Sequence, residues 1–318
     1  MPTLLQVLDG VKPANSPPIR VDLVPGSRFR YSGGGYSVLQ QLLIDVMGKP
    51  FPELMRELVF APLKMNRSIF EQPLSDKLRT SAAVAHTLSG ERLQGNWRIH
   101  PELAAAGMWS TPSDLARLLI EVQESGAGRS GKVFSTATVN QMLTPQSGDW
   151  GLGFAVEGQG RAARFSHGGS TEGFNSLIVA YNETGQGAVI MTNSVRGNAL
   201  LDEILRSIAR EYGWTDYRPV ERIVVAVDRK VYAAYVGQYQ LEISPDYAVA
   251  ISVEAGKLMM EIKQPAGRLK AELLPESETR FFRTDVNVQV TFVKDERGQV
   301  TGLIVHQQGA EYRARRIG

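Results

Sequence analysis

Two glycine-flanked segments carry the side chains best suited to chemistry, Tyr31-Ser32-Gly33 and Ser166-His167-Gly168-Gly169-Ser170. A tyrosine acts as a general base when nearby positive charge lowers its pKa from an ordinary value of about 10. A histidine on a strand edge supplies that charge or donates a hydrogen bond. Glycines beside it let a substrate carbonyl approach the backbone, where exposed N–H groups bind an oxyanion. The two segments are therefore candidates for the basic and the oxyanion-binding parts of a catalytic site.

Both segments also have an ordinary structural interpretation. A tyrosine before glycines often packs its ring at a turn, and a histidine beside glycines often has its hydrogen bonds satisfied on a surface or in a core. The glycine triplet at 33–35 lacks the GxGxxG spacing of dinucleotide sites, and the chain has no GxxxxGK[ST] phosphate loop. Ser130 and Ser170 lack the second glycine of a GxSxG elbow, and the carboxylates show no pairing typical of glycosidases.

The composition indicates a globular protein for which no metal site and no cofactor is expected. The 318 residues suit two domains, and 43% of them are apolar. Lys+Arg 35 against Asp+Glu 33 give a net charge of +2, which predicts neither a nucleic-acid nor a membrane partner. Cysteine is absent, and the four histidines lack any tight ligand spacing. No signal peptide is recognisable, so the expected location is cytoplasmic as the chain stands, and periplasmic or secreted if an amino-terminal segment is missing.

Helical periodicity dominates the first half of the chain, after about 30 residues that look irregular. Apolar residues recur with helical spacing over 36–49, where Gly48 occupies the C-cap position, and again over 51–63. Thr111 and Asp114 are typical of a helix start. A shorter helix is expected over 135–143 and a long one over 199–214. The apolar stripes of these helices are expected to lie in the core.

Strand patterns form two groups. The first comprises 151–158, 164–169, 174–182 and 187–194. The second fills the end of the chain, at 231–241, 247–255, 257–264, 271–276, 280–285, 288–307 and 311–316, and a DERG tetrad within it reads as a hairpin turn. The expected fold class is α+β, with a helix and antiparallel-sheet domain over residues 1–218 and a small all-β barrel or sandwich over 219–318.

Three segments in this order resemble a known family: YSGGGYSVLQQLLIDVMGKPFPELMRELVFAPLKM, AAAGMWSTPSDLARLL and FSHGGSTEGFNSLIVAYNETGQGAVIMTNS. They are similar to the class C β-lactamases and penicillin-binding-protein-like serine hydrolases, which include family VIII carboxylesterases and D-aminopeptidases. The resemblance implies a β-lactamase/transpeptidase-like fold for the first domain, N-terminally incomplete. The segment starting at AAYVGQYQL looks like the lipocalin-like domain that many members carry.

The resemblance also implies roles for individual residues. The family's Tyr-x-Asn motif falls on Tyr31-Ser32-Gly33, so Tyr31 would be the general base or its partner, and Gly33 replaces the substrate-holding asparagine. The Lys-Thr-Gly motif, which is His-x-Gly in some branches, falls on His167-Gly168-Gly169. His167 would orient the substrate or raise the local positive potential. Gly169 would border an oxyanion hole, half of which is the backbone N–H of Ser170.

One family motif has no match in the chain. The family's nucleophile is the serine of a Ser-x-x-Lys motif upstream of the tyrosine, and no lysine here has a serine three residues before it. Three explanations stay open. The chain is a truncated or mis-started member; or it is a short member that has recruited Ser32, Ser37 or Ser170 or takes parts from another chain; or it is a non-catalytic relative.

The expected function is β-lactamase-related serine hydrolysis of a small-molecule ester, amide or β-lactam-like substrate. The missing nucleophile motif should remove most of the acyl-transfer rate. The alternative is a non-catalytic relative that binds a ligand or a partner. An incomplete sheet would expose apolar surface, so assembly into a homo-oligomer, or a substitute element covering that surface, is also expected.

Overall fold

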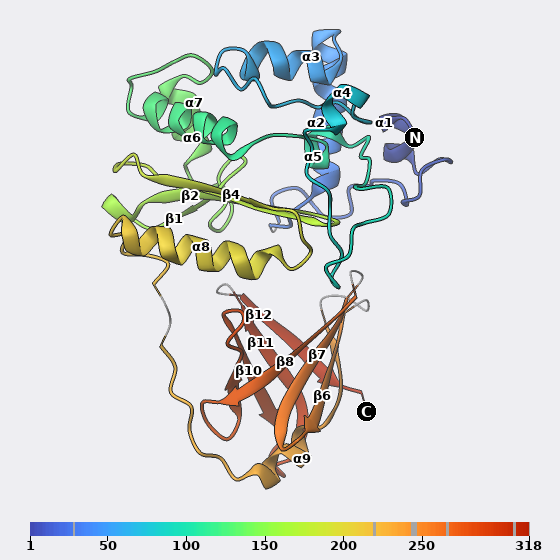
Figure 1. Cartoon of the computed structure of the whole chain (residues 1–318), viewed down its shortest axis with the longest axis vertical. Helices are drawn as coiled ribbons and strands as arrows, with labels where there is room; N and C mark the ends of the chain where they lie inside the picture. Colours follow the sequence, from blue (N-terminus) through green and yellow to red (C-terminus); the bar gives the residue numbers. More distant parts are fainter. Residues whose placement is uncertain (28, 219–220, 243–246, 265–266, 308–309, 318) are drawn as a thin grey trace. The chain divides into compact units, whose positions relative to one another are not determined.

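The chain folds into two compact units, Met1–Asp216 and Tyr217–Gly318, each with its own hydrophobic core (Figure 1). The structure is a computed structural model that describes residues 1–27, 29–218, 221–242, 247–264, 267–307 and 310–317. The first unit combines helices with a four-stranded antiparallel sheet, and the second is a closed antiparallel barrel. The α+β fold class expected from the sequence is confirmed.

Helices occupy most of the first unit before its sheet. They are α1 (Leu4–Asp9), α2 (Gly33–Met47), α3 (Phe51–Met55), the π-helical turn η1 (Arg56–Phe60), α4 (Asp76–Arg79), α5 (Leu103–Ala106), α6 (Pro112–Gly126) and α7 (Thr136–Met142). The presence of α1 corrects the expectation of an irregular start. Thr3 Oγ1 accepts a hydrogen bond from Gln6 N, and Gln6 Oε1 accepts one from Thr3 N, so this short helix is held by a reciprocal cap.

The sheet of the first unit has the order β1-β2-β3-β4. Its strands are β1 (Ala155–Glu157), β2 (Arg164–Thr171), β3 (Phe174–Tyr181) and β4 (Gly187–Thr192), with the 3-10 turn η2 (Gly160–Ala162) before β2. Figure 1 shows α6 and α7 on one face of this sheet and α8 (Gly197–Glu211) on the other. Both faces are thus covered, and the sheet can present β2 residues at its open edge.

One expectation about the helices is wrong. Most stripes pack inward as expected, such as Leu115, Leu119 and Val122 on α6. On α2 the buried side chains are Ser37 and Gln40, and Ile44 packs against a core cluster. Six other apolar residues of this helix are exposed: Val38, Leu39, Leu42, Leu43, Val46 and Met47. Helical periodicity identifies an apolar face but does not supply the surface that covers it.

The second unit is a barrel closed in the order β10-β11-β12-β5-β6-β7-β8-β9. Its strands are β5 (Gly237–Leu241), β6 (Ala248–Glu254), β7 (Lys257–Gln264), β8 (Gly267–Pro275), β9 (Arg280–Phe282), β10 (Val288–Lys294), β11 (Val300–Gln307) and β12 (Ala310–Arg316). β10 and β11 pair as the predicted hairpin, with Gly298 at φ +77° in its turn.

The start of the barrel differs from the strand predicted over 231–241. A 3-10 turn, η3 (Arg229–Val231), and the helix α9 (Tyr232–Tyr235) precede β5. Tyr232 and Tyr235 are both buried, and their spacing of three residues places them on one side of a helix but on opposite faces of a strand. A helix is therefore favoured over a strand in this segment, because it lets both tyrosine rings enter the same core.

Aromatic side chains fill the barrel interior. The rings of Tyr235 and Phe292 stack with centroids 4.0 Å apart, and Phe281 meets both edge-on. Tyr235 Oη donates to Glu278 O at 2.6 Å, and Tyr239 Oη donates to Tyr235 O at 2.7 Å. The buried phenols thus have hydrogen-bond partners, and the interior is a packed core.

Candidate functional site

The glycine triplet forms the first turn of α2. Ser32 is its N-cap, and Ser32 Oγ accepts a hydrogen bond from Gly35 N at 3.0 Å. A Cβ on Gly34 would lie 3.0 Å from Ile19 Cγ2, so the missing side chain lets the preceding segment pass close to the helix. Glycines weaken a helix by about 1 kcal/mol each, but the cap at Ser32 and the left-handed C-cap at Gly48 stabilise its ends. Tyr31 is held immediately before this capped turn.

His167 lies on β2, opposite Ile178 of β3. The pairing of β2 with β3 continues through Gly169 and Ser170 to the end of the strand. A Cβ on Gly169 would lie 2.5 Å from Ser176 Oγ, so any larger residue there would require that side chain to move. The glycines thus place no side chain over this end of β2, which leaves its backbone accessible.

The edge of β2 beyond His167 exposes backbone donors. β1 pairs only with the segment of β2 that ends at Ser166. The hydrogen bond from Asn182 N to Ala163 O fixes the alternation between β2 and β3, and it directs the N–H of Ser170 away from β3. This N–H is therefore placed on the open edge, as an oxyanion donor requires.

Four rings gather around the two candidate residues. The ring centroids of Tyr31 and His167 are 6.0 Å apart, and Trp150 lies 5.8 Å from Tyr31 and 5.7 Å from His167. Phe29 stacks on Trp150 at 5.3 Å, with the planes inclined by 13°. Tyr31 is 55% exposed, so a ligand can reach this aromatic cluster from solvent. The fold thus brings together Tyr31 and His167, which the sequence had singled out separately.

Phe29 and Trp150 were not predicted as site residues. Trp150 precedes β1 and is fixed by backbone hydrogen bonds, including Gln146 N to Trp150 O at 2.6 Å. Its sequence signal is a tryptophan next to Gly151 in a polar, turn-like segment, and loops often carry binding residues. Phe29 has no periodicity that would assign it to a core or to a site.

Tyr36 supports the same region from the first turn of α2. Burial raises the pKa of the Tyr36 phenol, and the negative charge that Tyr31 would carry when ionised raises it further. Tyr36 Oη also lies 3.8 Å from the position of a Cβ on Gly153. Tyr36 is therefore a neutral phenol near the site, able to donate a hydrogen bond.

The three candidate serines occupy different positions. Ser32 Oγ is the α2 cap, and Ser37 is 1% exposed and donates to Gly33 O at 3.4 Å. Ser170 is exposed, but it lies three residues from His167 on a strand, so the two side chains point to opposite faces of the sheet. A nucleophilic serine would direct its hydroxyl group toward His167, and none of these three serines occupies such a position.

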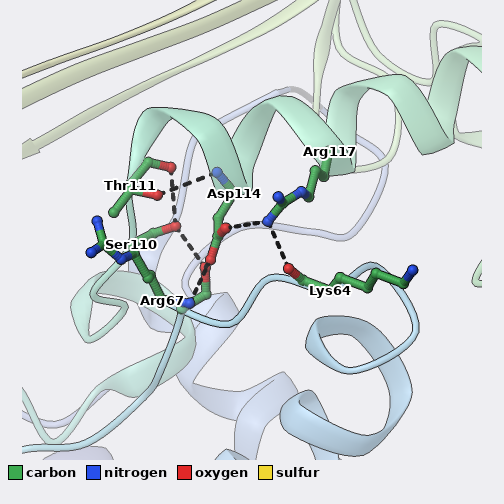
Figure 2. Close-up of polar contacts among 7 residues, drawn as sticks. Lys64, Arg67, Ser110, Thr111, Asp114 and Arg117 are labelled. Atoms are coloured by element: carbon green, nitrogen blue, oxygen red, sulfur yellow. Dashed lines mark hydrogen bonds and ion pairs between the residues drawn. The ribbon is translucent and has the colours of Figure 1, made fainter.

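A buried carboxylate anchors the start of α6 (Figure 2). Asp114 is 2% exposed; its Oδ2 accepts from Arg67 N at 2.8 Å and from Ser68 Oγ at 3.0 Å, and its Oδ1 accepts from Arg117 Nη1 at 2.8 Å. Arg117 Nη1 also donates to Lys64 O at 2.7 Å. Through these hydrogen bonds Asp114 links the 64–68 loop to α6, so its role is structural.

The described residues lack both a metal-binding cluster and a membrane-spanning helix. Within the described ranges, no group of three or more His, Asp or Glu side chains is arranged to hold a metal ion. The helices in the same part of the chain include none with the length and apolar character needed to cross a bilayer.

Known families match both units. The Beta-lactamase family matches residues 3–212, and a domain of unknown function, DUF3471, matches residues 221–316. Penicillin-binding protein 4* of Bacillus subtilis (strain 168) is 25% identical over 310 residues, which cover 91% of this chain and 67% of that protein. A putative D-alanyl-D-alanine carboxypeptidase of Escherichia coli O157:H7 is 27% identical over 157 residues, which cover 42% of this chain and 36% of that protein.

Solved structures show the same fold. The octameric penicillin-binding protein homologue from Pyrococcus abyssi aligns with a TM-score of 0.53 and 19% identity, over 92% of this chain and 66% of that one. A penicillin-binding protein from Bacillus halodurans aligns with a TM-score of 0.51 and 19% identity, over 64% of this chain and 63% of that one. The chain thus spans about two thirds or less of the length of these relatives.

Proposed function

Because the chain belongs to the beta-lactamase family, we propose that the aromatic cluster of Phe29, Tyr31, Trp150 and His167 is its acyl-binding site for serine-hydrolase chemistry. The substrate would be a small ester, amide or β-lactam-like molecule. One observation carries the proposal: Tyr31 and His167, from the two family motifs, approach to 6.0 Å beside an open strand edge.

Each group has a role that its position supports. The N–H of Ser170 would bind the developing oxyanion, because it points away from β3 at the open edge of β2. The His167 imidazole would orient the substrate carbonyl. The Tyr31 phenol would take a proton from the attacking hydroxyl group and give one to the leaving atom, which is oxygen in an ester and nitrogen in an amide or β-lactam. Gly33 and Gly169 would leave room for the substrate backbone, and Trp150 would stack on an apolar acyl group.

Of the groups that acyl transfer needs, the nucleophile has the weakest candidates in this chain. Ser32 and Ser37 are engaged in α2, and Ser170 Oγ faces away from His167. The residues described above would therefore bind and polarise an acyl group. The rate of any turnover depends on which hydroxyl attacks, and labelling can identify that hydroxyl.

Hydrolysis of p-nitrophenyl butyrate and of nitrocefin tests the proposal. Tyr31→Phe and His167→Ala should each lower kcat/KM about 100-fold, which is the usual scale for loss of an acid–base group. Tyr212→Phe, at an exposed tyrosine after α8, and His306→Ala, in the barrel, serve as matched controls that should keep the parental rate. Equal rates for all five proteins would refute the assignment.

A second candidate function is non-catalytic binding at the same cluster. The structural engagement of Ser32 and Ser37 favours it. Treatment with a fluorophosphonate probe, followed by mass spectrometry, separates the two functions. A labelled serine supports hydrolysis and names the nucleophile, whereas saturable binding of benzylpenicillin without a labelled serine supports binding alone.

A further inference from the structure

The strand end that carries the Ser170 N–H is paired on one side only. Among the described residues, β1 pairs with β2 as far as Ser166, and beyond that point β2 pairs with β3 alone. Gly168 and Gly169 add no side chains there, and glycine leaves the backbone the greatest conformational freedom. An oxyanion donor must lie about 2.7–3.1 Å from the charge that it stabilises, so this strand end needs support from another part of the fold.

A two-residue turn, Glu172-Gly173, joins β2 to β3 and lies directly beyond this strand end. Gly173 has φ +86°, a left-handed conformation that a turn of this kind assigns to glycine. A Cβ on Gly173 would lie 2.4 Å from Ala85 Cβ. The turn therefore packs directly on residues 84–98, which we call the tether segment.

An arginine of the tether segment binds the same turn. Arg98 Nε donates to Glu172 Oε2 at 2.5 Å, and Arg98 Nη2 donates to Glu172 Oε1 at 3.0 Å. Two parallel hydrogen bonds fix the direction as well as the distance between the two groups. The hydrogen bonds from Arg98 lower the pKa of the Glu172 carboxyl below its ordinary value of 4.5, although burial opposes them. The ion pair is therefore formed at neutral pH.

The tether segment is itself anchored to the first unit. Near its start, His86 N donates to Asn193 O, just beyond β4, at 3.1 Å. Near its end, Trp97 is 9% exposed, and its ring meets that of Trp109 edge-on with centroids 5.2 Å apart. Arg98 follows Trp97 directly, so its backbone is fixed by a packed core. The arginine can therefore hold the turn in one position relative to the sheet.

We propose that Arg98 is a positioning residue, which through its ion pair with Glu172 holds the β2–β3 turn so that the Ser170 N–H stays in place as oxyanion donor. This inference rests on the proposed function, in which that N–H binds the oxyanion. Such a donor acts mainly on the transition state, so its displacement should lower kcat and leave KM nearly unchanged. A misplacement of about 1 Å can cost about 100-fold in rate, and a loosened turn should cost about tenfold.

A second ion pair of the first unit is a matched control. Arg129 donates from Nε and Nη2 to the two carboxylate oxygens of Glu124, at 2.8 Å and 2.7 Å. The geometry is the same, but these partners are five residues apart at the end of α6, whereas Arg98 and Glu172 are 74 residues apart. Exposed ion pairs contribute little to overall stability. The two pairs should therefore differ in their effect on the β2–β3 turn and not in their effect on folding.

Amide ¹⁵N relaxation of the full chain tests the tether without any substrate. A rigid backbone amide has an order parameter of about 0.85, and a mobile one has a value below about 0.6. The Ser170 amide should be rigid in the parent and move toward the mobile range in Arg98→Ala and in Glu172→Ala. Exchanging the charges, in Arg98→Glu/Glu172→Arg, should restore its order. Arg129→Ala and Glu124→Ala should leave it unchanged.

Hydrolysis of p-nitrophenyl butyrate tests the consequence for the reaction. Arg98→Ala and Glu172→Ala should each lower kcat about tenfold, with KM within about twofold of the parental value. The variant with exchanged charges should recover most of kcat. The control variants Arg129→Ala and Glu124→Ala should keep both constants, and circular dichroism verifies that all of the variants fold.

The outcomes separate this inference from the proposed function. Unchanged order of the Ser170 amide in both single variants would overturn the tether, as would a charge-exchanged pair that behaves like the single variants. A parental kcat in Arg98→Ala, together with a mobile Ser170 amide, would overturn the positioning role and leave the proposed function intact. A parent that hydrolyses no ester would count against the proposed function, and the relaxation comparison would then decide the tether alone.

Discussion

The two units use the same kinds of side chain in opposite ways. In the barrel, the stacked rings of Tyr235 and Phe292 are buried, and every strand has a neighbour on each side. In the beta-lactamase-like unit, the stacked rings of Phe29 and Trp150 lie at a surface. Among the described residues, β1 and β4 are the edge strands of its sheet, and β1 pairs with β2 only as far as Ser166. Closure satisfies the backbone groups of the barrel, whereas an open edge leaves donors that a ligand can use.

This contrast favours the first unit as the location of the proposed function. The barrel interior is filled by a packed core of aromatic and aliphatic side chains. The first unit keeps an exposed aromatic cluster and an open edge on β2. A ligand or partner that covers exposed apolar groups and unpaired backbone donors lowers the free energy of the complex, so such surfaces are candidates for binding.

The largest expected effect is the loss of an aromatic ring from the barrel. Phe292→Ala should lower the free energy of unfolding of the barrel by about 3–5 kcal/mol, because the ring is 3% exposed and contacts three other aromatic rings. Tyr31→Ala should cost the first unit less than about 1 kcal/mol, since Tyr31 is 55% exposed. Urea unfolding followed by hydrogen exchange reports each unit separately. Similar losses of unfolding free energy in both variants would contradict the contrast between buried rings in the barrel and exposed rings in the first unit.

The next effect concerns the anchor of α6. Asp114→Ala should destabilise the first unit by about 2–4 kcal/mol, because Arg67 N and Ser68 Oγ would lose a buried charged acceptor. Asp9→Ala, at an exposed carboxylate of α1, is the matched control and should change stability by less than about 0.5 kcal/mol. The same hydrogen-exchange experiment measures the stability of both variants. A loss of stability in Asp114→Ala that is confined to the barrel would contradict this prediction.

A smaller, pH-dependent effect is expected at Glu121 of α6. Burial would raise the pKa of the Glu121 carboxyl, but hydrogen bonds from Ser130 Oγ at 2.7 Å, Val133 N at 3.0 Å and Ser125 Oγ at 3.0 Å outweigh it and lower the pKa below its ordinary value of 4.5. A carboxyl whose pKa is lower in the folded state stabilises the fold above its unfolded pKa. That contribution is lost as the pH falls through the folded pKa.

Glu121→Gln should therefore cost about 1–2 kcal/mol at pH 7, and its difference from the parent should shrink as the pH falls below about 4. Glu254 of the barrel provides the comparison, because a hydrogen bond from Lys270, followed by one from Ser252, also lowers its pKa, but at an exposed position. Glu254→Gln should change the pH profile much less. Thermal unfolding between pH 3 and 7 measures both variants, and a constant difference between Glu121→Gln and the parent would disprove the linkage.

The smallest expected effect sharpens the role of the aromatic cluster. Trp150→Ala should weaken binding of benzylpenicillin about three- to tenfold, the amount expected for loss of one aromatic contact. Tyr212→Ala, at another exposed ring of the first unit, should leave the affinity unchanged. Isothermal titration calorimetry measures both. Unchanged affinity in Trp150→Ala would remove this ring from the site.

Local patterns in the sequence predicted the elements that local interactions stabilise. Thr111 caps α6 through a hydrogen bond from Asp114 N at 3.3 Å, and Gly48 ends α2 at φ +63°, as their residue types indicated. The β10–β11 hairpin follows from its turn residues. The ordered motifs indicated the family and singled out Tyr31 and His167 as candidates, because motif spacing is preserved in the sequence itself.

The tertiary structure decided what depends on contacts between distant segments. Phe29 and Trp150 join Tyr31 and His167 only because the chain folds their segments together. The Tyr232–Tyr235 segment is helical because both rings enter one core. The stripe of α2 reads as a core face in the sequence, yet it is exposed in the described part of the chain, while Gln40 on the other side of the helix bonds to Pro101 O and Ala104 N. Periodicity determines that a helix has an apolar face, and only packing determines what that face meets.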